Sequence, residues 1–139
     1  MSSCIVGIGN RYRSDDAVGS IVAQRLGGIQ LSGDGAQLLE LFKQFTDVIL
    51  IDAVQSGAPP GTIFRFDGIQ DPLSREMFAT STHAFGLVEA VELARTLVQL
   101  PRTLIIYGIE GTNFSSGTTL SPEVSQAIEI VVTQIHDPR

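Results

Sequence analysis

The sequence predicts an α/β protein, a three-layer sandwich in which helices cover both faces of a twisted, mostly parallel sheet of about five strands. Short apolar runs, typical of buried strands, alternate along the whole chain with longer stretches whose apolar residues recur at helical spacing. No internal repeat, low-complexity segment or linker interrupts this alternation. The length of 139 residues suits one folding unit, so we expect a single domain over residues 1–139.

The first half of the chain predicts three strands and two helices. Residues 4–9 and 47–53 are apolar on both alternating faces, as in strands buried between two layers of helices. Residues 15–26 carry apolar side chains at helical spacing and end at two glycines. Residues 36–45 form a second helical stretch with a wide apolar face, and residues 29–31 form a short strand between the two helices.

The second half predicts two strands and two helices. A short proline- and glycine-containing turn precedes residues 62–66, so this strand is expected to be antiparallel and to lie at the edge of the sheet. Residues 68–82 are weakly patterned and predict a surface loop. A helix is expected over 87–100, a strand over 103–107, and a last helix that begins near Pro122, a residue favoured at the first helical position, and ends near His136.

Composition excludes several classes of function. Fifteen acidic against nine basic residues give a net charge of −6, which argues against the basic surface that binds nucleic acid. A single cysteine, Cys4, excludes an internal disulfide and a cysteine-based zinc site, and its place in an apolar strand favours an inert thiol. No apolar run approaches the about 18 residues that span a bilayer, and no leader pattern is present. We expect a cytoplasmic monomer without membrane insertion.

Three polar side chains are predicted to converge at one edge of the sheet. Asp16 follows the first strand at a helix start, Asp52 closes the central strand, and His83 lies in the loop before the third helix. Ligands of open α/β sheets gather beyond the carboxyl ends of the strands. Two carboxylates and one imidazole suit a transition metal with open coordination positions, and the same residues could instead perform acid–base chemistry.

Each of these residues also has a purely structural interpretation. Asp15 and Asp16 sit where helix starts favour negative charge, and His83 could cap a helix or bind a backbone carbonyl. A purely structural role is harder to assign to Asp52, because an acid at the end of a buried strand needs hydrogen-bond donors or a cation. The pair Gly7 and Gly9 does not form a dinucleotide site, since the third glycine position is missing and acids would face the phosphates.

Four sequence blocks, in order, resemble the nickel–iron hydrogenase maturation proteases from residue 4 to about residue 135. They are Gly-Ile-Gly-Asn with Asp-Asp-Ala-Val-Gly, then Ile-Leu-Ile-Asp-Ala, then Ser-Thr-His-Ala-Phe-Gly-Leu, then Tyr-Gly-Ile-Glu with Leu-Ser-Pro-Glu-Val. Many members carry an Asp-Gly-Gly-Thr-like turn after the second strand, thought to help select the substrate. This chain differs there, at residues 31–36, and leaves the partner hydrogenase open.

The resemblance implies an endopeptidase that removes the C-terminal extension of a hydrogenase large-subunit precursor after nickel insertion. It implies that Asp16, Asp52 and His83 contact the metal and carry the catalysis. Gly7, Gly9 and Asn10 would shape the loop that holds Asp16, and Gly86 would allow close approach beside His83. The nickel is expected to arrive within the substrate, with zinc or cadmium able to replace it in vitro.

Two alternatives remain open on the sequence. A nickel-dependent docking or chaperone module without peptidase activity is favoured by the absence of a recognisable nucleophile, since the chain has no Gly-x-Ser-x-Gly elbow and no plausible cysteine–histidine arrangement. A small-metabolite α/β hydrolase is suggested by fold analogy alone. Cleavage of the precursor, nickel-dependent binding without cleavage, and turnover of generic esters without nickel distinguish the three hypotheses.

Overall fold

A five-stranded sheet forms the middle layer of the computed structural model, which describes residues 2–78 and 84–136. The strand order is β2-β1-β3-β5-β4. All neighbours pair in parallel except β4 and β5, which are antiparallel, so the predicted edge strand is confirmed. The bounds are Ser3–Ile8 for β1, Ile29–Leu31 for β2, Asp47–Val54 for β3, Ile63–Asp67 for β4 and Thr103–Glu110 for β5.

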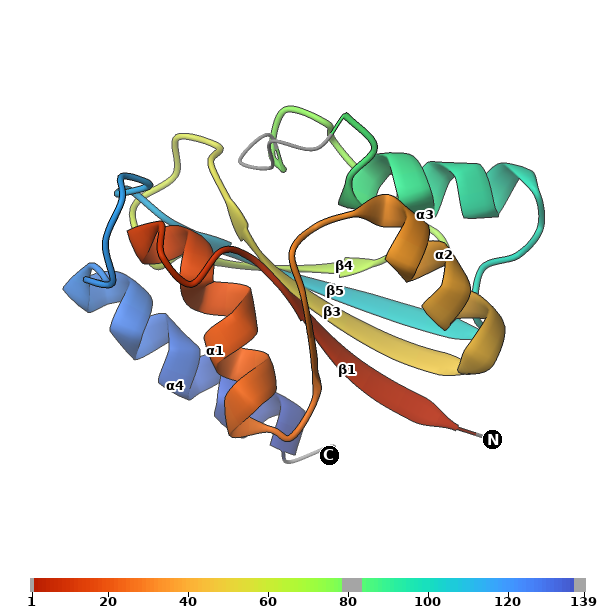
Figure 1. Ribbon diagram of the computed structural model, residues 1–139, viewed down its shortest axis with the longest axis horizontal. Helices are drawn as coiled ribbons and strands as arrows, with labels where there is room; N and C mark the ends of the chain where they lie inside the picture. Colours follow the sequence, from red (N-terminus) through yellow and green to blue (C-terminus); the bar gives the residue numbers. More distant parts are fainter. Residues whose placement is uncertain (1, 79–83, 137–139) are drawn as a thin grey trace.

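Helices cover both faces of this sheet, which confirms the three-layer fold (Figure 1). Helices α1 (Val18–Arg25) and α4 (Pro122–His136) pack together on one face, and α2 (Gly35–Gln44) and α3 (Leu87–Thr96) pack together on the other. Within the described residues, no helix combines the length and the apolar character needed to cross a membrane.

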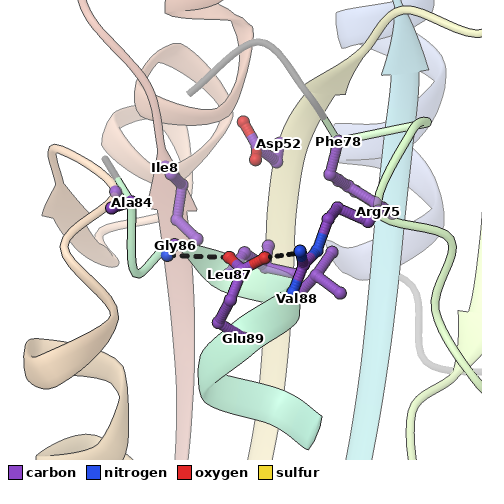
Figure 2. Close-up of a pocket in the computed structure, with 10 residues that line it drawn as sticks. Ile8, Asp52, Arg75, Phe78, Ala84, Gly86, Leu87, Val88 and Glu89 are labelled. Atoms are coloured by element: carbon purple, nitrogen blue, oxygen red, sulfur yellow. Dashed lines mark hydrogen bonds and ion pairs between the residues drawn. The ribbon is translucent and has the colours of Figure 1, made fainter. Parts of the chain in front are cut away.

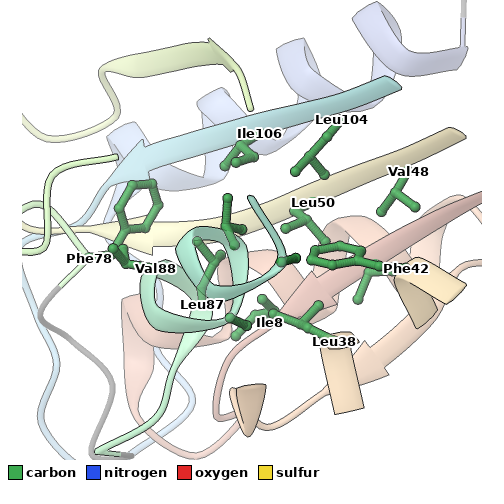
Figure 3. Packing of buried hydrophobic residues seen from close by; sticks show 14 of the residues in the cluster. Ile8, Leu38, Phe42, Val48, Leu50, Phe78, Leu87, Val88, Leu104 and Ile106 are labelled. Carbon is green, nitrogen blue, oxygen red and sulfur yellow. The ribbon is translucent and has the colours of Figure 1, made fainter. Parts of the chain in front are cut away.

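The core is divided by the sheet into two apolar clusters. Alternation along β3 sends Leu50 towards α2 and α3, where it joins Phe42 and Ile106, and sends Ile51 towards α1 and α4 (Figure 3). Strands that contribute to both clusters must be apolar on both faces. This is why the runs that predicted β1, β3 and β5 alternate so little between apolar and polar residues.

Glycines bring α1 unusually close to the sheet. A Cβ atom added to Gly19 would lie 2.3 Å from the carbonyl oxygens of both Ile8 and Ile51, and one added to Gly7 would lie 1.9 Å from the Gly19 oxygen. The helix backbone therefore rests directly on β1 and β3. Asp16 lies in the segment directly before α1. The contact between α1 and the sheet therefore also fixes the position of Asp16 at the carboxyl ends of the two strands.

Four predicted elements differ from the observed ones. The strand expected over 103–107 runs on to Glu110 as β5, because it keeps pairing with β3 beyond Tyr107. The helix expected over 15–26 begins as a 3-10 turn, η1 (Ser14–Ala17), and becomes α-helical only from Val18; Ser14, at the start of the turn, takes a positive φ of 53°. Helix α3 ends at Thr96 rather than at residue 100, since Val98 takes a φ of 55° that a helix cannot continue. The segment 68–82 is not simply a surface loop: in its described part, Phe78 is buried and packs against the α2–α3 cluster.

Candidate functional site

Asp16 is held at the edge of the sheet by the turn that leaves β1. Its carboxylate oxygen Oδ2 accepts a hydrogen bond from the backbone N–H of Asn10 at 3.1 Å. The Asn10 side chain accepts in turn from the N–H of Tyr12 at 2.9 Å, which fixes the turn. A Cβ atom on Gly9 would lie 2.1 Å from the Asp16 carbonyl oxygen, so a glycine is needed where the turn passes under η1. Asp16 is buried.

Asp52 lies near the end of β3, two residues before the strand stops, and only 3 % of its surface is exposed. Its carboxylate accepts a hydrogen bond from the N–H of Ala53 at 2.8 Å. Burial raises the pKa of Asp52 well above its ordinary range, and the negative charge of Asp16 raises it further. The structure therefore brings Asp16 and Asp52 together at the carboxyl ends of the adjacent parallel strands β1 and β3, as predicted.

Asp15 points into a different environment from its neighbour. Its carboxylate accepts hydrogen bonds from the backbone N–H groups of Thr112, Asn113 and Ser121, and from the Ser121 hydroxyl, at 2.8–2.9 Å. Burial acts to raise the pKa of Asp15, but these hydrogen bonds outweigh it and lower the pKa overall. Asp15 thus ties the loop after β5 to η1. Its role is structural, which is one of the interpretations that the sequence allowed for the adjacent acids Asp15 and Asp16.

A pocket of about 250 Å³ opens beside Asp52, between the ends of β1 and β3 and the start of α3 (Figure 2). Its apolar wall includes Ile8, Phe78 and Leu87, and Figure 2 shows Asp52 across the pocket from the Arg75–Glu89 ion pair. The volume lies just below the roughly 300–1,000 Å³ of pockets for drug-sized ligands. It is suited to one side chain or a short peptide segment rather than to a large cofactor.

His83 lies outside the described residues, so its predicted place beside the two acids is not tested. Within the part of the chain that is described, no cluster of three or more histidine, cysteine, aspartate and glutamate side chains could hold a metal ion. The roles of Asp16, Asp52 and His83 as metal-contacting and catalytic residues therefore stay predictions. Cys4 fits its predicted inert role, because burial raises the pKa of its thiol to about 11.

Sequence reasoning missed three charged residues near the site. Arg75 fell in the segment interpreted as a surface loop, and only the fold reveals that it lines the pocket. Glu89 is three residues after Gly86 at a helix start, a capping pattern that could have been noticed. Glu110 is buried at the end of β5 and accepts hydrogen bonds from the N–H groups of Ser56 and Gly57, which fixes the loop after β3.

Comparison with protein-family models shows the family to which this chain belongs. The model of the HycI hydrogenase maturation protease family matches residues 29–137, which is most of the sequence. The chain belongs to the hydrogenase maturation protease family. The matched region includes Asp52 and His83, whereas Asp16 precedes it.

Individual relatives agree with this assignment. The chain is 27 % identical to the hydrogenase expression/formation protein HupD of Thiocapsa roseopersicina, a match that covers 89 % of this chain and 61 % of that protein. The chain thus spans about three-fifths of the length of this curated relative.

Solved structures of maturation proteases share the fold. The maturation protease HybD of Thermococcus kodakarensis is 24 % identical, with a TM-score of 0.72 over 98 % of this chain and 97 % of that chain. The maturating endopeptidase HybD of E. coli is 20 % identical, with a TM-score of 0.74 over 97 % of this chain and 90 % of that chain.

Proposed function

We propose that this protein is an endopeptidase that removes the C-terminal extension of a nickel–iron hydrogenase large-subunit precursor after nickel has been inserted. Membership of the maturation protease family supports the reaction class. The observation that carries the proposal is the pairing of Asp16 with Asp52 at the carboxyl ends of β1 and β3, beside a pocket of peptide size. Open α/β sheets bind their ligands at this place.

The pair of acids suits a cation that arrives with the substrate. The burial of Asp52 makes its ionised form costly, and the negative charge of Asp16 adds to that cost. A divalent ion offsets both effects, and carboxylate oxygens are suitable ligands for transition metals. In this proposal the precursor presents nickel on its own thiolates, and Asp16, Asp52 and His83 complete the coordination.

Selectivity for the nickel-loaded precursor follows from the difference between its affinity for this protein and that of the nickel-free precursor. A precursor without nickel makes no metal contact with the two acids, so it docks weakly. A nickel-loaded precursor gains the metal contacts and docks in register. No separate sensor of nickel insertion is then required.

Hydrolysis in this proposal uses an activated water as the nucleophile. The nickel brought by the precursor would lower the pKa of the water and polarise the scissile carbonyl, and a carboxylate of the pair would accept the proton as the water attacks that carbonyl. Asn10 contributes by holding Asp16 through its backbone N–H, so that the carboxylate keeps one orientation.

The test is the mass of a purified precursor after incubation with this protein. We expect nickel-loaded precursor to lose its C-terminal extension and nickel-free precursor to stay intact. Asp16→Asn and His83→Ala should abolish the mass change, because each removes a metal contact. His136→Ala is the matched control, since His136 is exposed in the last turn of α4. Continued cleavage by both site variants would refute the assignment of the site.

The same measurement distinguishes the docking module from the protease. A module without peptidase activity binds nickel-loaded precursor and leaves its mass unchanged. Turnover of generic esters without nickel would instead favour a small-metabolite hydrolase.

A further inference from the structure

The pocket beside Asp52 contains a single positively charged side chain among the described residues that line it. This is Arg75, in the segment that leads from β4 towards α3. The other charged groups on the walls are carboxyl groups, those of Asp52 and Glu89. A cation in an otherwise acidic pocket is a specific feature that neither the family assignment nor the pair of acids explains.

Glu89 holds the Arg75 guanidinium in place. One carboxylate oxygen of Glu89, Oε1, accepts a hydrogen bond from the N–H of Gly86 at 2.9 Å, where α3 begins. The other oxygen, Oε2, pairs with Nε of Arg75 at 2.9 Å (Figure 2). Glu89 is therefore anchored by the helix start and presents the arginine from a fixed position, with 21 % of its own side chain exposed.

Arg75 keeps most of its hydrogen-bonding capacity for another partner. Its side chain is 77 % exposed, and within the described part of the chain its ion pair with Glu89 uses only Nε of a group with five N–H donors. Arg95 offers a contrast. Its guanidinium binds the backbone carbonyls of Gly68 and Ile69 as well as the carboxylate of Glu92, which makes it a structural brace.

We propose that Arg75 binds acceptor oxygens of the precursor segment that lies in this pocket, either backbone carbonyls or a carboxylate. The inference rests on the proposed function and adds a specificity-determining residue to it. An extended peptide has carbonyl oxygens without internal partners, and the acids at the site repel any carboxylate that it carries. A guanidinium supplies directed donors for both kinds of oxygen. The apolar wall of Ile8, Phe78 and Leu87 then receives one side chain of the same segment.

The experiment compares Arg75→Met with Arg102→Met in the cleavage of nickel-loaded precursor. Arg102 is the matched control, because it also forms an exposed ion pair, with Asp47 at 2.8 Å, at the opposite end of the sheet. Loss of a charge-assisted contact predicts a KM about ten- to a hundredfold higher for Arg75→Met, with kcat within about twofold. Arg102→Met should match the wild type in both constants. Equal KM values for the two variants would overturn the inference.

Binding measurements separate this inference from the proposed function. The affinity of each variant for nickel-loaded precursor is measured without reference to cleavage, and weaker binding by Arg75→Met alone supports the inference even if no cleavage occurs. A wild type that binds but never cleaves overturns the proposed function. A second precursor with an amidated C-terminus and neutral replacements for its C-terminal acids identifies the oxygen. If Arg75→Met weakens binding of this precursor equally, the contact is to backbone carbonyls; a smaller effect assigns it to a carboxylate.

Discussion

At the scale of single residues, the ionised forms of the buried acids Asp15 and Asp52 have opposite effects on the stability of the fold. Asp15 is surrounded by donors that lower its pKa against the effect of burial. Asp52 is buried with one backbone donor and a neighbouring carboxylate, and its pKa is raised. Ionised Asp15 therefore stabilises the folded state and ionised Asp52 destabilises it, which gives each residue its own dependence on pH.

Replacing Asp52 by asparagine should stabilise the protein at pH 7 while abolishing cleavage. The pKa of Asp52 is higher in the folded than in the unfolded state, so protonated Asp52 stabilises the fold. This stabilisation is complete below the unfolded pKa of about 3.8 and is lost as pH rises through the folded pKa. We expect Asp52→Asn to gain about 1–2 kcal/mol at pH 7 in urea unfolding. The gain should vanish in acid near the unfolded pKa. A variant that is less stable than the wild type at pH 7 would contradict this account.

Replacing Asp15 by alanine should have the opposite effect. The change leaves three backbone N–H groups and one hydroxyl without their acceptor, and we expect a loss of about 3 kcal/mol or more. Because the folded pKa is lowered, the deficit relative to the wild type is largest above about 3.8 and shrinks as pH falls through the folded pKa. Asp34→Ala is the control: its carboxylate caps α2 through one bond, and about 1 kcal/mol is expected. Equal losses for the two variants in urea unfolding would refute the bracing role.

At the scale of elements, the contact between α1 and the sheet decides where Asp16 lies. Gly19→Ala should destabilise the protein by about 3 kcal/mol or more, because its methyl group would meet the backbone oxygens of Ile8 and Ile51, which cannot give way cheaply. Gly27→Ala is the control, since its Cβ meets nothing within 4 Å and only the φ of 71° opposes it, at about 1 kcal/mol. Thermal unfolding measures both. A similar shift in the two variants would show that the close approach is not needed.

The elements themselves were largely predictable, because the three central strands β1, β3 and β5 lie between two layers of helices and consist mainly of continuous apolar runs. The short connection before residue 63 also indicated an antiparallel edge strand correctly. The predictions failed where tertiary contacts override local pattern. Phe78 lies in a polar stretch and is buried because its ring packs against Phe66 of β4 and joins the α2–α3 cluster. Strand β5 continues to Glu110 because the chain pairs with β3 beyond Tyr107.

At the scale of the whole molecule, topology explains which parts of the site could be predicted. Asp16 follows β1 and Asp52 lies near the end of the neighbouring parallel strand β3, so their meeting could be inferred once the strands were recognised. The Arg75–Glu89 pair joins a loop to a helix start across the pocket, and no spacing in the sequence indicates that contact. Convergence of strand ends is a property of the fold class, whereas the position of a loop depends on individual side-chain contacts.

The central claim is that Asp16 and Asp52 form one site that recognises nickel carried by the precursor. The most direct measurement is the affinity of this protein for nickel-loaded and nickel-free precursor, repeated with Asp16→Asn and Asp52→Asn. We expect the wild type to bind the nickel-loaded form at least about tenfold more tightly, a difference of about 1.4 kcal/mol, and both variants to lose this preference. Equal affinity of the wild type for the two precursors, or a preference that survives in both variants, would contradict the account.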